Sequence, residues 1–534
     1  MKADRRTAIA LGAGAVATAG GGAAIAFRST PLPPGPVEGA TPSRGHRLRQ
    51  GDFPAPARTE RAGIVIIGGG IAGLAAGWTL AEAGFTDFRL LEIEDAPGGN
   101  ARSGANAVSD YPLGAHYLPI PNREAVALRR MLARLGVITG EADGLPVYDP
   151  AQLCADLQER LLWRGRWQEG LVPTTGLTPQ DRTDLARFDT LMADARRAIG
   201  RDGRPAFATP IAYSSRDPDW LALDQQSFAA WLDARGLTSP LLRAHVRYAM
   251  RDDYGTEPDA ASAWAGVHYF AGRRGHAAAG VADNVLTWPG GNGHLAQAMA
   301  TRFPDRIATG RIVHRVMRED GGAVIDSFDI AKGTTTRIHA DAAILATPLF
   351  ITSRLCGEPG DVSACTYAPW LVANVTVARP PRGPGVPLAW DNVSSTSDSL
   401  GYVVATHQSR ALPGETVLSW YMPLSDMTPA VGRCLLLERS ADEWKRIVRD
   451  DLLTMHPDLE IREIALSRWG HAMIRPTPGY IWQRRQGFTP PPPPLYLAHS
   501  DLSGLSLFEE AHWQGCRAAE GAMALIGHAH EALT

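Results

Sequence analysis

Lysine and cysteine are both scarce in this chain of 534 residues. The lysines are Lys2, Lys332 and Lys445, so arginine supplies nearly all of the 53 basic residues, and a catalytic lysine has only these three possible positions. The 5 cysteines contain no C-x-x-C pair. This argues against a zinc ribbon, a thioredoxin-type site and a disulfide-rich scaffold.

An excess of positive charge is also missing, because 53 basic residues face 56 acidic ones for a net charge of −3. This excludes the usual electrostatic signature of a nucleic-acid partner. The sequence has no G-x-S-x-G, no H-E-x-x-H and no carboxylate-rich metal loop, so it indicates neither a hydrolase nor a metalloenzyme and predicts no metal ligand. Its 45% hydrophobic and 20% charged residues are typical of globular proteins. The length predicts about three structural units or one large interleaved enzyme.

The N-terminus has the layout of an export signal. Arg5 and Arg6 precede the uncharged Ala/Gly-rich run 7–27, and Ala24-Ile25-Ala26 is a small-residue cleavage site. Residues 1–30 therefore predict a twin-arginine-type signal, the twin-arginine export machinery as a partner, and a periplasmic or otherwise exported protein. An uncleaved membrane anchor is the alternative, since about 20 uncharged residues can span a bilayer. Residues 31–61, rich in Pro, Gly and Arg, predict a linker.

A strand, a glycine turn, a helix and an acid follow one another from Gly63. The β-branched run Ile64–Ile67 predicts a buried strand, 68–73 reads GGGIAG, and 74–83 has helical spacing. A second strand-like run, 88–91, ends at Glu92. In a dinucleotide site the glycines allow the tight turn and a close approach of the pyrophosphate, and the acid accepts bonds from the ribose hydroxyls. The predicted cofactor residues here are Gly68, Gly70, Ile71, Ala72, Gly73 and Glu92.

The next segment distinguishes FAD from NAD. Residues 92–103 (EIEDAPGGNARS) resemble the E-x-x-x-x-x-G-G-R-x-x-[ST] run of the flavin-containing amine oxidase and phytoene desaturase superfamily. Asn100 replaces the arginine of that run, and Arg102 is positioned to supply the missing charge. Residues 113–118 (LGAHYL) look like the family loop behind the isoalloxazine ring. The resemblance adds these cofactor residues: Gly98, Gly99, Asn100, Arg102, Gly114, Ala115 and His116.

Four later segments continue the resemblance in the family's order. They are 288–295, 311–316 with Val313 beside adenine, 341–348 with Ala346, and 495–501 with Asp501 near the ribityl chain. Some family members attach FAD through a cysteine in the C-terminal flavin segment, and Cys434 and Cys516 fall outside it. The resemblance therefore implies non-covalent FAD.

The resemblance also implies how the fold is organised. It predicts an α/β protein whose Rossmann-like FAD-binding domain is built from residues 62–150, 285–355 and 470–534. An interleaved α+β substrate domain with an antiparallel sheet is predicted from residues 151–284 and 356–469. Alternating runs such as Tyr402–Ala405 and Thr416–Trp420 suit that sheet.

Family members transfer a hydride from a substrate C–H to flavin N5, and oxygen or another carrier then reoxidises the flavin. Many hold a lysine near N5, but residues 367–375 contain none, Lys332 lies in a predicted hairpin, and Lys445 is expected on an outward-facing helix. Asn374 could hold a water there. Tyr480 takes the approximate place of an aromatic cage residue, with core packing as the alternative. His116 and His471 are candidate bases or substrate-orienting residues, with a structural role as the alternative.

Three functions remain open at this point. The first is oxidation of an amine or polyamine, for which Asp252, Asp253, Glu257 and Asp259 are candidate acidic contacts. The second is desaturation or isomerisation of an apolar, carotenoid-like small molecule, and the third is a non-enzymatic FAD-binding protein. Tyr254 and Trp264 are candidates for the substrate pocket, with helix packing as the alternative. Neither the substrate nor the oligomeric state follows from the sequence.

Overall fold

The computed structural model describes residues 31–278, 284–357, 362–409, 414–483 and 490–534. The chain divides into two compact units, Met1–Leu32 and Pro33–Thr534, and the second carries everything described below. The predicted export signal, residues 1–30, lies outside the described residues and stays a prediction. No helix within the described ranges is both long and apolar enough to cross a membrane.

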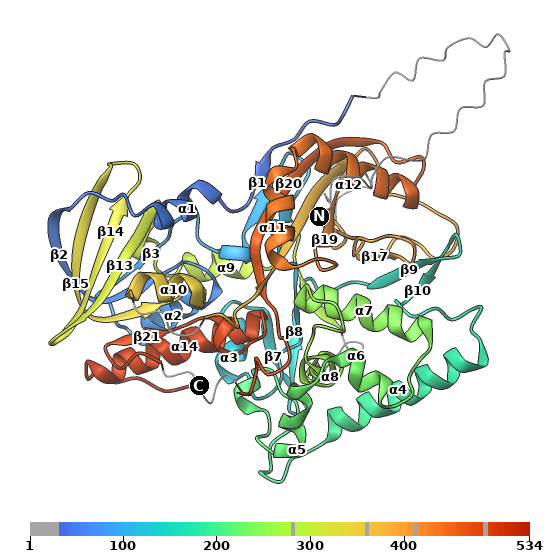
Figure 1. The fold of residues 1–534 in the computed structure, drawn as a ribbon, viewed down its shortest axis with the longest axis horizontal. Coiled ribbons are helices and arrows are strands. Elements are labelled where there is room, and N and C mark those ends of the chain that lie inside the picture. The colour runs from blue at the N-terminus through green and yellow to red at the C-terminus, as the bar shows by residue number, and fades with distance from the viewer. Residues whose placement is uncertain (1–30, 279–283, 358–361, 410–413, 484–489) are drawn as a thin grey trace, which may run out of the picture. The chain divides into compact units, whose positions relative to one another are not determined.

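The first large sheet is built around the strand that precedes the glycine turn (Figure 1). β2 (Pro56–Ile67) pairs in parallel with β3 (Phe88–Leu91) and with β15 (Thr334–Leu345). Its last four residues, 64–67, are almost completely buried, as expected of a strand covered on both faces. The other strands of this sheet are β12 (Ile307–Ala308), β13 (Arg311–Glu319), β14 (Gly322–Asp329) and β21 (Leu495–Leu497).

Alternate residues of β2 point into two cores. Ile64 and Ile66 pack with one group of helices, and Val65 and Ile67 pack on the opposite face. The first group is α2 (Ile71–Glu82), α3 (Val126–Arg134), α9 (Gly293–Ala300) and α14 (Phe508–Leu525). The opposite face is covered by α10 (Leu349–Cys356). Helices on both faces of a largely parallel sheet confirm the predicted α/β, Rossmann-like fold class.

The second sheet has eight strands and is mostly antiparallel. In spatial order they are β1 (Val37–Glu38), β20 (Ile461–Ile474), β16 (Tyr367–Val377), β19 (Thr416–Pro423), β18 (Tyr402–Val404), β17 (Asp391–Ser394), β9 (Glu159–Trp163) and β10 (Arg166–Glu169). The helices α11 (Pro429–Glu438) and α12 (Ala441–Met455) pack on one face. Most of these strands come from the segments predicted for the substrate domain, but the domain boundaries themselves stay a prediction.

A third, helical core completes the described structure. Its helices are α4 (Pro179–Arg197), α5 (Pro218–Leu221), α6 (Phe228–Asp233), α7 (Pro240–Tyr254) and α8 (Ala263–Ala271). Short paired strands connect the layers: β4 (Ser103–Ala105) with β5 (Asp110–Pro112), β6 (Tyr117–Pro119) with β11 (Val285–Thr287), and β7 (Ile138–Ala142) with β8 (Leu145–Tyr148). Tyr254 and Trp264 are fully buried in this helical core, so the packing alternative holds for both.

Two predictions about the surface differ from the structure. Residues 37–61 are not a linker, because they form β1, α1 (Pro42–Gln50) and the first half of β2. Lys445 does not face outward. It is buried on α12, where its Nζ donates to the carbonyl of Gly35 at 2.8 Å. The reason is the same for both: the segment predicted to be a linker packs over α12 and provides the carbonyl that a buried ammonium needs.

Candidate active site

The glycine turn is shaped by contacts that exclude side chains. Gly68 has a φ of +100°, and a Cβ there would collide with the carbonyl of Ala346. A Cβ on Gly73 would collide with the carbonyl oxygen of Gly68. Gly70, which precedes α2, has nothing within 4 Å of a Cβ position. Gly68 and Gly73 therefore allow close packing inside the protein, whereas Gly70 leaves open space in front of the unpaired N–H groups of the helix.

Glu92 closes the turn from the next strand. One carboxylate oxygen accepts from the N–H of Gly69 at 2.6 Å and the other from the N–H of Glu94 at 2.8 Å. Burial raises the pKa of Glu92, while the two backbone bonds oppose the rise. The side chain thus fixes the turn and still presents oxygen lone pairs to the space beside it.

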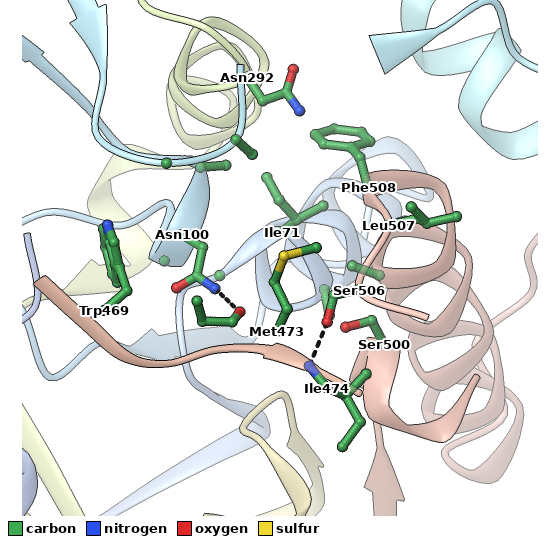
Figure 2. A pocket seen from close by; sticks show the side chains of 18 of the residues that line it. Ile71, Asn100, Asn292, Trp469, Met473, Ile474, Ser500, Ser506, Leu507 and Phe508 are labelled. Atoms are coloured by element: carbon green, nitrogen blue, oxygen red, sulfur yellow. Dashed lines mark hydrogen bonds between the residues drawn. The ribbon is translucent and has the colours of Figure 1, made fainter. Parts of the chain in front are cut away.

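A cavity of about 390 Å³ runs from this turn to the second sheet (Figure 2). Ile71 at the start of α2, Met473 on β20 and Phe508 at the start of α14 border the same space. The predicted cofactor residues that line it are Gly68, Gly70, Ile71, Ala72, Glu92, Gly98, Gly99, Asn100, Gly114, Ala115, His116, Ala346 and Asp501. The chain positions predicted from separate segments therefore meet at one site.

This lining fits a dinucleotide. Besides the open space at Gly70, the buried Oδ1 of Asn292 lines the cavity and has no hydrogen-bond partner among the described residues. A buried acceptor without a partner is costly, so a ligand donor at this place would be stabilising. The start of α2 offers its N–H groups and its dipole to an anion such as a pyrophosphate.

Three predicted cofactor residues do not reach the cavity. Gly73 serves the packing described above, and Val313 is buried in the core on the opposite face of the first sheet. Arg102 turns away and donates from Nη2 to the carbonyl of Gly39 at 2.8 Å. Asn100 does line the cavity, but its amide donates to the carbonyl of Ala472, as Figure 2 shows. Neither Asn100 nor Arg102 therefore replaces the family's arginine as a charge on the phosphates.

Two of the four predicted catalytic residues are used inside the protein. Asn374 donates to the carbonyl of Pro112 at 3.0 Å and accepts from the hydroxyl of Ser419 at 2.6 Å. Its amide is thus occupied and lies outside the cavity lining. The hydroxyl of Tyr480 donates to the carbonyl of Asp501 at 3.2 Å, so this side chain holds the backbone of the turn that follows β21. Tyr480 is thus packed in the core, which was the alternative to an aromatic cage.

His116 and His471 both line the cavity. The ring of His116 stacks on Tyr421 with centroids 4.5 Å apart, and that of His471 stacks on Phe350 at 4.6 Å. Burial lowers the pKa of each imidazole to about 4. Both are therefore neutral at neutral pH and can accept a hydrogen bond, but a pKa this low makes each a weak base.

Asp501 is held by two donors from separate elements. The hydroxyl of Tyr367 donates to its carboxylate at 2.5 Å and the N–H of Leu349 at 2.9 Å. Burial raises its pKa, but His499 and these donors outweigh burial and lower it. The carboxylate therefore stays charged where the cavity passes the end of β21.

An aromatic wall that sequence reasoning missed encloses the opposite end. Tyr421 donates to the carbonyl of Gly114 at 3.2 Å, and the indole N–H of Trp469 donates to the carbonyl of Leu113 at 2.6 Å. Tyr117 and Trp370 complete this wall. The alternating runs 402–405 and 416–420, which overlap β18 and β19, predicted an antiparallel sheet but gave no register that would select these rings.

An acidic cluster lies beside the wall. Arg273 Nη2 is 2.7 and 2.8 Å from the two carboxylate oxygens of Asp253, and it donates to the hydroxyl of Tyr117 at 2.9 Å. Asp252 has only a long contact of 3.5 Å from Tyr117 and no ion pair within the described structure. Burial, followed by the charge of Asp253, raises the pKa of Asp252. Both aspartates end α7, where the helix dipole disfavours a carboxylate.

Glu509 faces the same end of the cavity from α14. It is buried, and its carboxylate bonds to the backbone N–H of its own residue but forms no ion pair in the described structure. Burial raises its pKa to about 7. The other two predicted acids behave differently, because Glu257 pairs with Arg247 at 2.7 Å and Asp259 is exposed. Two of the four acids predicted for a polyamine thus reach the cavity, and Glu509 was missed.

Lysine is absent from the cavity lining in the part of the chain that the structure describes. Lys332 is exposed and lies 3.7 Å from Asp329, and Lys445 is bound to Gly35. The described ranges also contain no group of three or more His, Cys, Asp or Glu residues that could hold a metal ion.

A Rossmann-like turn, a ribose-side acid and a long cavity ending at a second sheet together define the class of FAD-dependent oxidoreductases. A family model described as flavin containing amine oxidoreductase matches residues 71–523, and the chain belongs to that family. The predicted resemblance is confirmed to this extent.

Individual known proteins are similar to this chain over stretches of different length. A polyamine oxidase 7 from Oryza sativa subsp. japonica is 40% identical over 68 residues, which is 13% of this chain and only 14% of that relative. A wild-type putrescine oxidase bound to putrescine shares the fold with a TM-score of 0.60 and 16% identity, over 87% of this chain and 100% of the other. A cyclohexylamine oxidase from Brevibacterium oxydans has a TM-score of 0.61 and 15% identity, over 87% and 99%. At these identities the structures show a common fold.

Proposed function

We propose that this protein is an exported enzyme that holds FAD non-covalently and oxidises an amine or polyamine, with oxygen or another carrier as the final electron acceptor. Export is supported by the pattern of residues 1–30. The amine is supported by the family, by the substrates named for its structural relatives and by the cavity itself.

The observation that carries the substrate class is the excess of carboxylates at the substrate end of the cavity. Asp252, Asp253 and Glu509 line it with a single cation, Arg273, which forms its ion pair with Asp253. Uncompensated buried carboxylates are unfavourable, so a ligand that brings positive charge is stabilised there. A substrate with one ammonium group near Asp252 and Glu509 and a second amine nearer the aromatic wall matches this distribution.

When bound, FAD supplies the hydride acceptor at N5. The rings of Tyr421, Trp469 and Trp370 exclude water and offer π-faces to an amine or its oxidised, cationic product. The neutral imidazole of His116, stacked on Tyr421, lines the cavity and can orient a substrate amine through a hydrogen bond.

The flavin is expected to be released when the protein is denatured by acid. None of the 5 cysteines lines the cavity in the described structure, so no thiol is in place for a thioether bond to the cofactor. The measurement is the flavin absorbance of the supernatant after acid precipitation. Flavin that remains in the protein pellet would contradict this prediction.

Diamine oxidation is expected to lose efficiency as the pH falls below neutrality. The raised pKa of Glu509, about 7, means that the carboxylate becomes neutral below that pH and no longer attracts an ammonium group. An ordinary glutamate would lose its charge only near pH 4.3. We expect kcat/KM for a diamine to rise with pH through about 7 in the wild type. Glu509→Gln should reduce this rise to the part due to Asp252, whose pKa burial and the charge of Asp253 also raise to about 7. An unchanged profile in the variant would assign the titration to another group.

Anaerobic titration with a panel of substrates tests the function as a whole. We expect diamines and polyamines to bleach the visible flavin absorption more readily than monoamines of the same chain length. Bleaching by an apolar polyene instead would favour the desaturase alternative, for which the apolar lining residues Val372, Leu507 and Phe508 are the favouring observation. A fatty acid isomerase from P. acnes shares the fold with a TM-score of 0.55 and 16% identity, over 87% of this chain and 98% of the other. No reduction by any compound would favour a non-enzymatic FAD-binding protein.

A further inference from the structure

The segment that precedes the first long strand joins the two sheets. Residues 33–50, here called the strap, contain β1 and α1. β1 lies parallel to β20, with the N–H of Ile464 donating to Pro34 at 2.8 Å and that of Leu466 to Pro36 at 2.9 Å. The Nζ of Lys445 on α12 binds the same stretch by donating a hydrogen bond to the carbonyl of Gly35. In Figure 1 the blue chain passes from β1, beside β20, to α1, above the sheet that contains β13.

The other half of the strap holds the loop that follows Glu92. The N–H and hydroxyl of Thr41 donate to the two carboxylate oxygens of Glu94 at 2.7 and 2.8 Å. Arg44 donates to the carbonyl of Ile93 at 3.0 Å and to Asp95 at 2.8 Å. The strap also receives the bond from Arg102, through the carbonyl of Gly39.

This loop is the cofactor loop, because Glu92, Ile93, Gly98 and Gly99 all line the cavity. The strap holds the shape of this loop, whereas no ion pair between the loop and the phosphates of the cofactor does so. In the described structure Arg273 is the only arginine or lysine in the lining, and it is committed to Asp253 at the substrate end. The side chain that could have faced the phosphates, Arg102, is bound to the strap instead.

The strap also lies beside β20, whose residues His471 to Ile474 line the cavity. Burial lowers the pKa of the lining imidazole of His471, and the charges of Arg433 and of Arg49 on α1 add to this effect. The strap therefore contacts the cofactor loop through Thr41 and Arg44, and β20 through β1.

We propose that residues 33–50 are a docking strap that controls retention of FAD. The strap holds the loop 92–102 in the shape that binds the cofactor, and the bound cofactor in turn holds the loop in the shape that binds the strap. Such coupling is reciprocal, so undocking of the strap weakens FAD binding by the factor by which FAD favours docking. This inference requires only that FAD binds, as proposed above, and is independent of the substrate.

Not every contact of the strap is suited to a test. The bond of Arg44 to Asp95 joins a carboxylate whose side chain is 81% exposed, and exposed ion pairs contribute little. Thr41 and Lys445 make the more buried contacts. Thr41→Val keeps the shape of the side chain and removes the hydroxyl bond to Glu94, and Lys445→Met removes the bond to Gly35. Lys332→Met is the matched control, since Lys332 is an exposed lysine whose ammonium lies near Asp329 and not near a strap carbonyl.

A variant with the opposite effect keeps the test decisive. Gly45 lies inside α1, and nothing is within 4 Å of a Cβ placed on it. Alanine favours a helix interior over glycine, so Gly45→Ala should stabilise the docked strap without new contacts.

The experiment measures FAD loss from the purified holoprotein by dilution, ultrafiltration and flavin absorbance of the filtrate. We expect loss to be about tenfold faster in Thr41→Val and in Lys445→Met, slower in Gly45→Ala and unchanged in Lys332→Met. We also expect FAD to protect the wild-type peptide bonds after Arg47 and Arg49 from trypsin. The proposal that the strap retains FAD would be wrong if Thr41→Val, Gly45→Ala and the wild type lost FAD at equal rates and if trypsin cleaved the strap equally with and without FAD. A folded wild type that binds no FAD would instead overturn the proposed function.

Discussion

Replacement of Gly70 by alanine is expected to leave a folded protein that binds FAD very weakly. A methyl group at this position meets no protein atom within 4 Å, so the apoprotein should keep its stability. The same methyl group would occupy the space through which a pyrophosphate approaches the start of α2. The loss of one or two hydrogen bonds to a charged group amounts to about 2–4 kcal/mol, which is roughly 30- to 1,000-fold in Kd.

The matched comparison is Gly73→Ala, three residues further along the same turn. There the new Cβ collides with the carbonyl oxygen of Gly68, so the fold itself should be destabilised. Thermal unfolding of both apoproteins and FAD titration of each provide the measurement. Equal FAD affinity in Gly70→Ala and the wild type would place the phosphates elsewhere and remove the main support for the cofactor site.

Asp252→Asn is expected to lower kcat/KM for a diamine by about 10- to 100-fold and to change the value for a monoamine of similar length little. The carboxylate lines the cavity without an ion pair in the described structure, so its interaction with an ammonium group is available to the substrate. A hydrogen bond to a charged group contributes about 1.5–3 kcal/mol, which corresponds to this range. Asparagine keeps the volume, and the neighbouring pair of Asp253 with Arg273 stays intact.

The control for this variant is Asp259→Asn, which removes the same charge from an exposed position outside the cavity. Steady-state kinetics with a diamine and a monoamine on all three proteins separate local recognition from the effect of net charge. A diamine-to-monoamine ratio that Asp252→Asn leaves at the wild-type value would show that this carboxylate does not bind the distal ammonium group.

The cofactor half of the cavity was predictable because its signals are local. A β-branched run, glycines at fixed spacing and an acid after the next strand each act on neighbours close in the chain, and Glu92 indeed bonds to Gly69. The later segments were found from their resemblance to a family and their order. The structure places Ala346 and Asp501 in the same lining as the turn.

The remaining errors share one physical cause, which is that a polar side chain binds whichever partner the fold brings to it. Arg102 was expected to face a phosphate and instead meets Gly39, more than sixty positions away along the chain. Lys445 was expected in solvent and meets the carbonyl of Gly35. Asn374 meets Pro112 and Ser419. No pattern within a short stretch of sequence encodes such distant contacts, and the same holds for the register that aims Tyr421 and Trp469 at the cavity.

The ring of electron-rich side chains around the cavity has an optical consequence. Tyr117, Tyr421, Trp370 and Trp469 all line it, and Tyr367 lines it beside Asp501. Tyrosine and tryptophan donate an electron to a photoexcited isoalloxazine when they lie close to it, and this quenches its emission. The holoprotein should therefore be almost non-fluorescent in the green, and emission should increase when FAD leaves, so that cofactor loss from the purified protein can be followed by fluorescence.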